Sequence, residues 1–182
     1  RKVMLIVSDR PAADYIRVTP VLNVNTHEGK LNIKLGFTGL KDSSQLQLAI
    51  TITEENQQTK HTIYERTQKP GWQKNEAVVD ILLPKINPWH FDRPALYRID
   101  VRVLDGKKTS DHISTTTGFR EIIFAGGKTW LNGEYIRLMG VEWTAGSNPD
   151  YGFAETDSVI LSQCSLMKAV NAIFTRQHFQ QD

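Results

Sequence analysis

Apolar and polar residues alternate with period two along much of this chain, and this pattern most constrains its fold. Every second residue is apolar from 31 to 37, and the pattern recurs over 45–52 and 97–103. Each run has one apolar and one polar face, as a half-buried antiparallel strand requires. The chain is therefore predicted to be mainly β, with a core that includes Ile33, Leu35, Leu48, Ile50, Tyr97, Ile99 and Val101.

Weaker strand patterns and turn residues complete this prediction. The weaker strands are Ile16–Asn25, His61–Arg66, Ala77–Leu83 and Ile113–Phe124. About seven short strands with turns at this spacing favour an antiparallel two-sheet β-sandwich. Pro20 places its strand at an edge or a bulge, because proline has no N–H for the ladder. Tyr97 opens a strand after a proline, a position typical of a tyrosine corner, in which the hydroxyl binds nearby backbone.

The pattern changes after 125–127. The segment Trp130–Ile136 contains Asn-Gly and predicts a hairpin, because Asn-Gly readily takes positive φ at both turn positions. A loop follows, and then a helical period from about Ser158 to Val170, with Thr156 or Asp157 as N-cap. Its expected apolar face holds Val159, Ile160, Leu166, Met167 and Val170. The run 172–175 predicts a further strand, which would complete a βαβ-like unit of a parallel sheet.

Composition excludes several classes of protein. The 22 basic and 20 acidic residues give a net charge of +2 and are scattered, so no nucleic-acid surface is indicated. No apolar run is long enough for a membrane span. The single cysteine excludes an internal disulfide, and the scattered histidines indicate no metal site. The compartment stays open, with a periplasmic or secreted location slightly favoured over the cytoplasm.

Four motifs carry a resemblance to a known family. They are the segments 88–97 (PWHFDRPALY), 117–122 (TGFREI), 131–133 (LNG) and 138–141 (LMGV). In order and spacing they resemble family 2 glycoside hydrolases, which include β-galactosidases, β-glucuronidases and β-mannosidases. The resemblance implies that 1–12 is the exit strand of a jelly roll, 13–124 an immunoglobulin-like sandwich, and 125–182 the start of an incomplete (β/α)8 barrel.

The same resemblance implies which parts of the enzyme lie elsewhere. A complete barrel needs about 250 residues, and the two catalytic carboxylates of a retaining glycosidase are absent from the motifs found. We expect no catalytic residue in this chain, no cofactor, and no activity of the chain alone. The expected parent is a retaining exo-β-glycosidase, most simply a β-galactosidase acting on a β-linked oligosaccharide or glycoside. The alternative is a non-catalytic immunoglobulin-like module that binds carbohydrate or protein.

His178 and Arg176 are the first candidates for substrate binding in the parent. They follow the second expected barrel strand, where (β/α)8 enzymes carry active-site groups. The family has an Arg three residues before a His in this region, and His178 matches that His when Gln181-Asp182 is the anchor. Thr175 then stands at the Arg position, so Arg176, one place later, would point to the other side of the strand. The alternative is a solvated strand end.

Glu142 and Trp143 are the second pair of candidates, because they follow the first expected barrel strand. A tryptophan can stack on a sugar face, and a carboxylate can bind its hydroxyls. The alternative, of equal weight, is a packing tryptophan and a solvated glutamate. Trp72 and Trp89 flank Pro/Gly turns, where packing at the edge of the core is preferred over a sugar platform.

The chain is also expected to be a piece of a longer protein, because Arg1 is not a natural start. In the parent, the apolar face of the helix would pack on barrel strands. A face of that size rarely stays open to water. We therefore expect the isolated chain to fold its tail onto the sandwich or, preferably, to self-associate.

Overall fold

A computed structural model describes residues 11–40, 43, 45–55, 60–144, 146 and 149–177. Within them the chain forms two compact units. The two-sheet unit comprises the described residues up to 123 together with 130–134, and the helix-bearing unit comprises 124–129 and the described residues from 135 on. The expected jelly-roll exit strand, residues 1–12, falls almost entirely outside the described residues.

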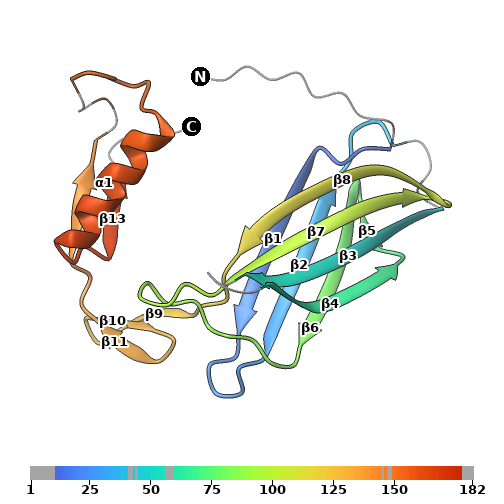
Figure 1. Cartoon of the computed structure of the whole chain (residues 1–182). Helices are drawn as coiled ribbons and strands as arrows, with labels where there is room; N and C mark the ends of the chain where they lie inside the picture. The colour runs from blue at the N-terminus through green and yellow to red at the C-terminus, as the bar shows by residue number, and fades with distance from the viewer. Residues whose placement is uncertain are drawn as a thin grey trace. The chain divides into compact units, whose positions relative to one another are not determined.

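The two-sheet unit consists of two antiparallel four-stranded sheets (Figure 1). One sheet has the order β1-β2-β6-β5, with β1 Tyr15–Leu22, β2 Gly29–Gly36, β6 Glu76–Leu83 and β5 Gly71–Gln73. The other has the order β4-β3-β7-β8, with β4 Lys60–Gln68, β3 Leu46–Glu55, β7 Leu96–Asp105 and β8 Lys108–Thr117. Their facing sides supply a single core.

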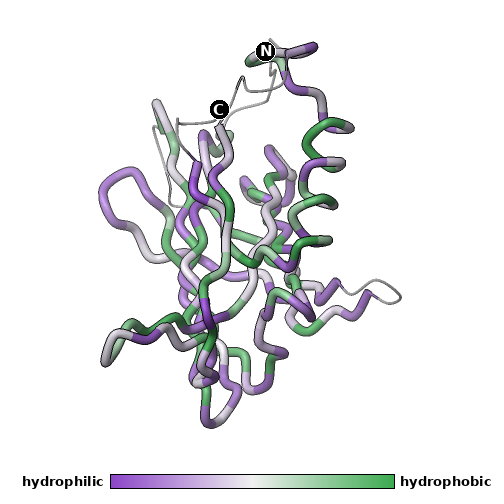
Figure 2. Tube along the Cα trace, turned by 90° about the vertical axis from the view of Figure 1, so that its left-hand side faces the viewer, coloured by the Kyte–Doolittle hydropathy of each residue, from purple (hydrophilic) through white to green (hydrophobic). Residues whose placement is uncertain are grey.

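The core confirms the period-two prediction. All seven residues expected inside have exposed fractions of 0% or 1%: Ile33, Leu35, Leu48, Ile50, Tyr97, Ile99 and Val101. Hydrophobic and hydrophilic residues alternate along the same strands in Figure 2. Pro20 lies in β1, which is an edge strand, as its missing N–H predicts.

Two strand predictions differ from the structure. Three-residue β5 is too short for an alternating pattern to show, so the two sheets contain eight described strands where seven were predicted. The segment expected as one strand over 113–124 is two, β8 and β9 Ile122–Ala125, separated by residues 118–121. Within that break Phe119 is fully buried, and its ring meets the Tyr97 ring edge to face with centroids 5.2 Å apart. The burial of Phe119 therefore interrupts the strand.

Tyr97 forms the predicted tyrosine corner. Its ring is fully buried, and its hydroxyl accepts the Asn87 N–H at 2.7 Å and lies 3.2 Å from the Asn87 carbonyl oxygen. The Glu54 carboxylate lies 3.4 Å from the same hydroxyl. Burial, opposed by the Asn87 bond and supported by Glu54, raises the pKa of Tyr97 to about 12. The corner ties the loop before β7 to strand β3.

The Asn-Gly hairpin also forms as predicted. β10 Lys128–Leu131 and β11 Glu134–Ile136 are joined by Asn132 and Gly133, both with positive φ (52° and 81°). The Asn132 side chain donates to the Trp89 carbonyl and accepts the Glu121 N–H, each at 2.9 Å. The Arg120 guanidinium lies 4.9 Å from the Trp89 ring centroid. Trp89 thus packs within the fold and joins the hairpin turn to the two-sheet unit.

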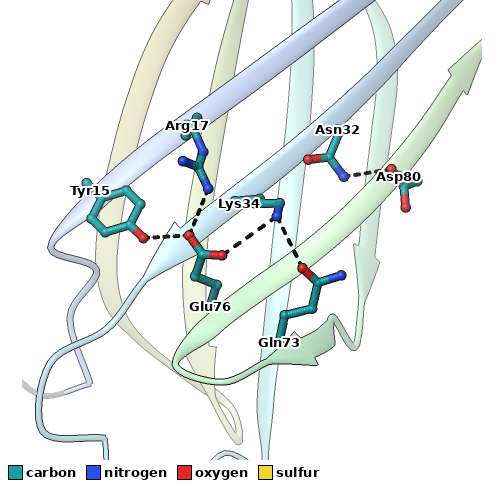
Figure 3. A network of polar contacts seen from close by, with 7 residues as sticks. All are labelled: Tyr15, Arg17, Asn32, Lys34, Gln73, Glu76 and Asp80. Carbon is teal, nitrogen blue, oxygen red and sulfur yellow. Dashed lines mark hydrogen bonds and ion pairs between the residues drawn. The ribbon is translucent and has the colours of Figure 1, made fainter.

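A polar network covers part of the outer face of the β1-β2-β6-β5 sheet (Figure 3). Glu76 Oε1 accepts from the Tyr15 hydroxyl at 2.6 Å and from Arg17 Nη2 at 3.0 Å, while Oε2 lies 3.7 Å from Lys34 Nζ. Lys34 in turn donates to Gln73. One carboxylate on β6 thereby holds the edge strand β1, with the central strand β2 between them.

The pKa of Glu76 gives a pH test of this network. The hydrogen bond from Tyr15, with Lys34 and Arg17 nearby, holds the Glu76 pKa below its ordinary value of 4.5. A carboxyl whose pKa is depressed on folding stabilises the fold above the unfolded pKa, and this is lost as pH falls through the folded pKa. We expect Glu76→Gln to lower the urea midpoint at pH 7 and to match the wild type well below pH 4. A difference that persists at low pH would contradict this.

The helix-bearing unit contains β12 Gly140–Trp143, α1 Asp157–Ala169 and β13 Phe174–Gln177. The predicted N-cap Thr156 has extended backbone and makes no side-chain cap bond. The least exposed helix positions are Val159, Gln163, Cys164 and Met167, which follow a helical stripe. Leu166 and Val170, expected on that face, are 65% and 66% exposed. The apolar face was thus placed partly wrong, because apolar residues lie around much of α1 (Figure 2).

Candidate functional site

The candidate site lies on the two parallel strands of the helix-bearing unit. β12 pairs with β13 in parallel, with Gly140 opposite Phe174 and Trp143 opposite Gln177. The Ile173 N–H donates to the Met139 carbonyl at 2.9 Å and extends the pairing by one bond. The chain therefore runs strand, loop, helix, parallel strand, as the change of period predicted.

Glu142 and Arg176 lie opposite one another in this pair, one residue before each strand ends. Arg176 Nη1 donates to Glu142 Oε2 at 2.7 Å, a charge-assisted hydrogen bond. The side chains are 61% and 44% exposed, so solvent reaches both. The structure thus brings together two of the four residues expected to bind substrate.

Trp143 lies on the other face of the pair. Neighbouring residues of a strand point to opposite sides, so Trp143 points away from the side of Glu142 and Arg176. It is 8% exposed, which leaves little of its ring open to a sugar. Its indole nitrogen is buried without a hydrogen-bond partner among the described residues. The geometry favours the packing alternative over stacking on a sugar.

His178 lies outside the described residues. In the sequence it comes directly after β13, which ends at Gln177. Trp72, the other tryptophan weighed for a sugar platform, contacts Phe37 with ring centroids 5.9 Å apart and so packs at the margin of the core.

Carboxylates dominate the edge of the unit at which β12 and β13 end. Because β13 is parallel to β12, it starts at the opposite edge, and α1 must carry the chain back to that edge. The first turn of α1 and the loop before it therefore lie at the edge where β12 ends. Asp150, Glu155 and Asp157 belong to this loop and the first turn of α1. Arg137 precedes β12 and Lys168 lies in the last turn of α1, so both belong to the opposite edge. Among described residues, Arg176 is thus the one cation on the acidic edge.

The described residues form neither a metal site nor a membrane-spanning helix. No group of three or more His, Cys, Asp or Glu side chains there could hold a metal ion. No helix in the described part is long and apolar enough to cross a membrane.

Comparison with known proteins identifies the family. The family model of glycosyl hydrolases family 2 matches residues 13–120. The chain belongs to this family. A Formosa agariphila protein provisionally named a beta-glucuronidase is 32% identical over 120 residues, or 63% of this chain and 10% of that protein. A beta-galactosidase of Vibrio vulnificus is 26% identical over 180 residues, or 94% of this chain and 17% of that protein.

Solved structures agree with this placement in fold. Beta-glucuronidase 3 of Bacteroides uniformis aligns with a TM-score of 0.76 at 22% identity, over 93% of this chain and 20% of that one. At that identity the likeness concerns the fold alone. The family 2 chain thus spans a fifth or less of the lengths of these relatives, whose names mention both galactosides and glucuronides.

Proposed function

We propose that this family 2 chain is part of a retaining exo-β-glycosidase that removes terminal β-linked sugars. In it, residues 13–124 form an immunoglobulin-like spacer, residues 125–182 enter a (β/α)8 barrel, and residues 1–12 leave a jelly roll. The observation that carries the proposal is the parallel βαβ-like unit that follows the family-matched segment after the Asn-Gly hairpin. Parallel strands with a crossover helix belong to larger α/β sheets, covered on both faces.

The strand ends give this unit its proposed role in substrate binding. In (β/α)8 enzymes the active site lies at the carboxyl ends of the strands. Glu142 and Arg176 stand at those ends on one face, joined by a 2.7 Å ion pair. We assign these two to contact with the sugar, together with His178, which follows β13 directly in the sequence. Trp143 would support the site from the covered face, since it is 8% exposed.

A β-galactosidase is the preferred specificity, supported by relatives of that name that align over 94% of this chain. The second candidate is a binding module without catalysis. The parallel unit argues against it, because the two-sheet unit has its own closed core and a binding module would have no use for an added pair of parallel strands.

The chain alone is expected to release no nitrophenol from nitrophenyl β-glycosides, because neither catalytic carboxylate motif is found in its sequence. The proposed longer protein should release it, and NMR of the first product should show the retained β-anomer. The control is the same assay on the longer protein with its first carboxylate motif mutated. Hydrolysis by the pure chain, lost when one of its residues is mutated, would contradict the proposal that both catalytic carboxylates lie outside residues 1–182.

A further inference from the structure

We infer that Glu142, held by Arg176, makes this site select neutral sugars and reject hexuronides. The inference rests on the proposed function, because it concerns the sugar that the proposed site would hold. It goes further in naming a specificity-determining residue and a residue that positions it. Relatives with both galactoside and glucuronide names leave that choice open.

A substrate at this site would meet the charges of Glu142 and Arg176. A hexuronide carries a carboxylate, which is bound most strongly by a cation whose charge no neighbouring carboxylate offsets. Arg176 is the one cation among the described residues of the acidic edge, and its guanidinium is bound to Glu142 Oε2 at 2.7 Å. A uronate that reached the other N–H groups of Arg176 would share one guanidinium with Glu142, so two carboxylates would lie side by side.

The charge around the Glu142–Arg176 pair is mainly negative. Asp150, Glu155 and Asp157 share the edge with Glu142, whereas Lys168 and Arg137 lie at the opposite edge. For a uronate and Glu142 about 6 Å apart at an effective dielectric of about 20, their repulsion alone amounts to roughly a hundredfold in binding. Arg176 offsets part of this repulsion, and the other carboxylates of the edge add to it. A neutral sugar has no such penalty, and its hydroxyls can donate to the Glu142 carboxylate.

Arg176 holds the Glu142 carboxylate in place. The pair lies in register across two hydrogen-bonded strands, so Arg176 fixes the position of the Glu142 carboxylate relative to the strand ends. Besides its assigned contact with the sugar, Arg176 therefore positions Glu142, and its charge offsets part of the negative field of that carboxylate. Removing Glu142 and removing Arg176 should thus change the sugar preference in opposite directions. A purely structural pair would impair both substrates together.

The test compares nitrophenyl β-galactoside with nitrophenyl β-glucuronide, using the proposed full-length enzyme. The wild type should prefer the galactoside by about a hundredfold in kcat/KM. Glu142→Gln should reduce this ratio at least about tenfold, mainly through KM, because the repulsion ends and Arg176 becomes available to the uronate. Arg176→Gln should raise the ratio, and Arg176→Lys should restore it toward the wild-type value.

The control variant is Glu65→Gln, the same substitution at an exposed position of β4, which should leave the ratio unchanged. A wild type that prefers the glucuronide overturns the inference, as does a Glu142→Gln variant that keeps the wild-type ratio. Either result leaves the proposed glycosidase standing. A full-length protein that hydrolyses no β-glycoside overturns the proposed function, and the inference falls with it.

Discussion

Tyr97→Ala is expected to lower the free energy of unfolding of the two-sheet unit by about 3–5 kcal/mol, as for other large buried aromatic residues. The ring is fully buried and packs edge to face on Phe119, and its hydroxyl accepts the Asn87 N–H. Its loss would leave a cavity in the core and a backbone N–H without its acceptor. Urea denaturation followed by circular dichroism measures the change.

Tyr97→Phe separates the hydroxyl from the ring. It should cost about 1–3 kcal/mol, because the ring stays while the Asn87 N–H loses its acceptor. The matched control is Tyr15→Phe, whose hydroxyl lies on an exposed face and should matter much less. If both substitutions cost the same, the corner contributes no special stability.

The raised pKa of Tyr97 adds a test by pH. A tyrosine whose folded pKa lies above its unfolded value of 10.0 contributes stability that is fully present below pH 10. That stability should be lost as the pH rises toward the folded pKa of about 12. The wild type should therefore lose more stability between pH 9 and 11 than Tyr97→Phe does. Equal losses in the two proteins would show that the hydroxyl is not buried.

The sequence predicts the two-sheet unit well because alternation directly reports which face of a strand is covered. Ile33 and Val101 are buried since their neighbours along the strand carry the polar face. The break at 118–121 could not be predicted in the same way. It depends on Phe119 packing against Tyr97 and on Trp89 binding the Phe119 carbonyl, contacts between residues distant in sequence.

The candidate site was predictable in location but not in geometry. The strand pattern placed Glu142 and Arg176 directly after two strands, whereas each lies one residue before its strand ends. The family motif gave Arg176 a doubtful orientation, because Thr175 holds the family's Arg position. The register of a parallel pair decides which side chains meet, and strands separated by a loop and a helix carry no local signal of register. The ion pair therefore became visible only in the structure.

Gly140 connects the stability of this pair with the site. A Cβ added at Gly140 would overlap the Phe174 carbonyl oxygen and lie 2.7 Å from Phe174 Cδ1. The carbonyl belongs to the backbone of the paired strand, so the strain cannot be relieved by rotating a side chain. Overpacking of this kind costs about 1–3 kcal/mol. We therefore expect Gly140→Ala to separate the start of β12 from β13.

The measurement is amide hydrogen exchange in the two strands. The protection factors of β12 and β13 should fall roughly five- to a hundredfold, the factor that corresponds to a local destabilisation of about 1–3 kcal/mol. The protection factors of β2 and β7 should not change. Gly71→Ala is the matched control, because a Cβ there meets only the Val78 carbonyl oxygen at an ordinary 3.6 Å. In the proposed full-length enzyme, Gly140→Ala should also weaken binding of the proposed galactoside, since the Glu142–Arg176 pair depends on the register of β12 and β13. Unchanged hydrogen exchange in β13 would show that the backbone at Phe174 accommodates the added methyl group without destabilising the strand pair.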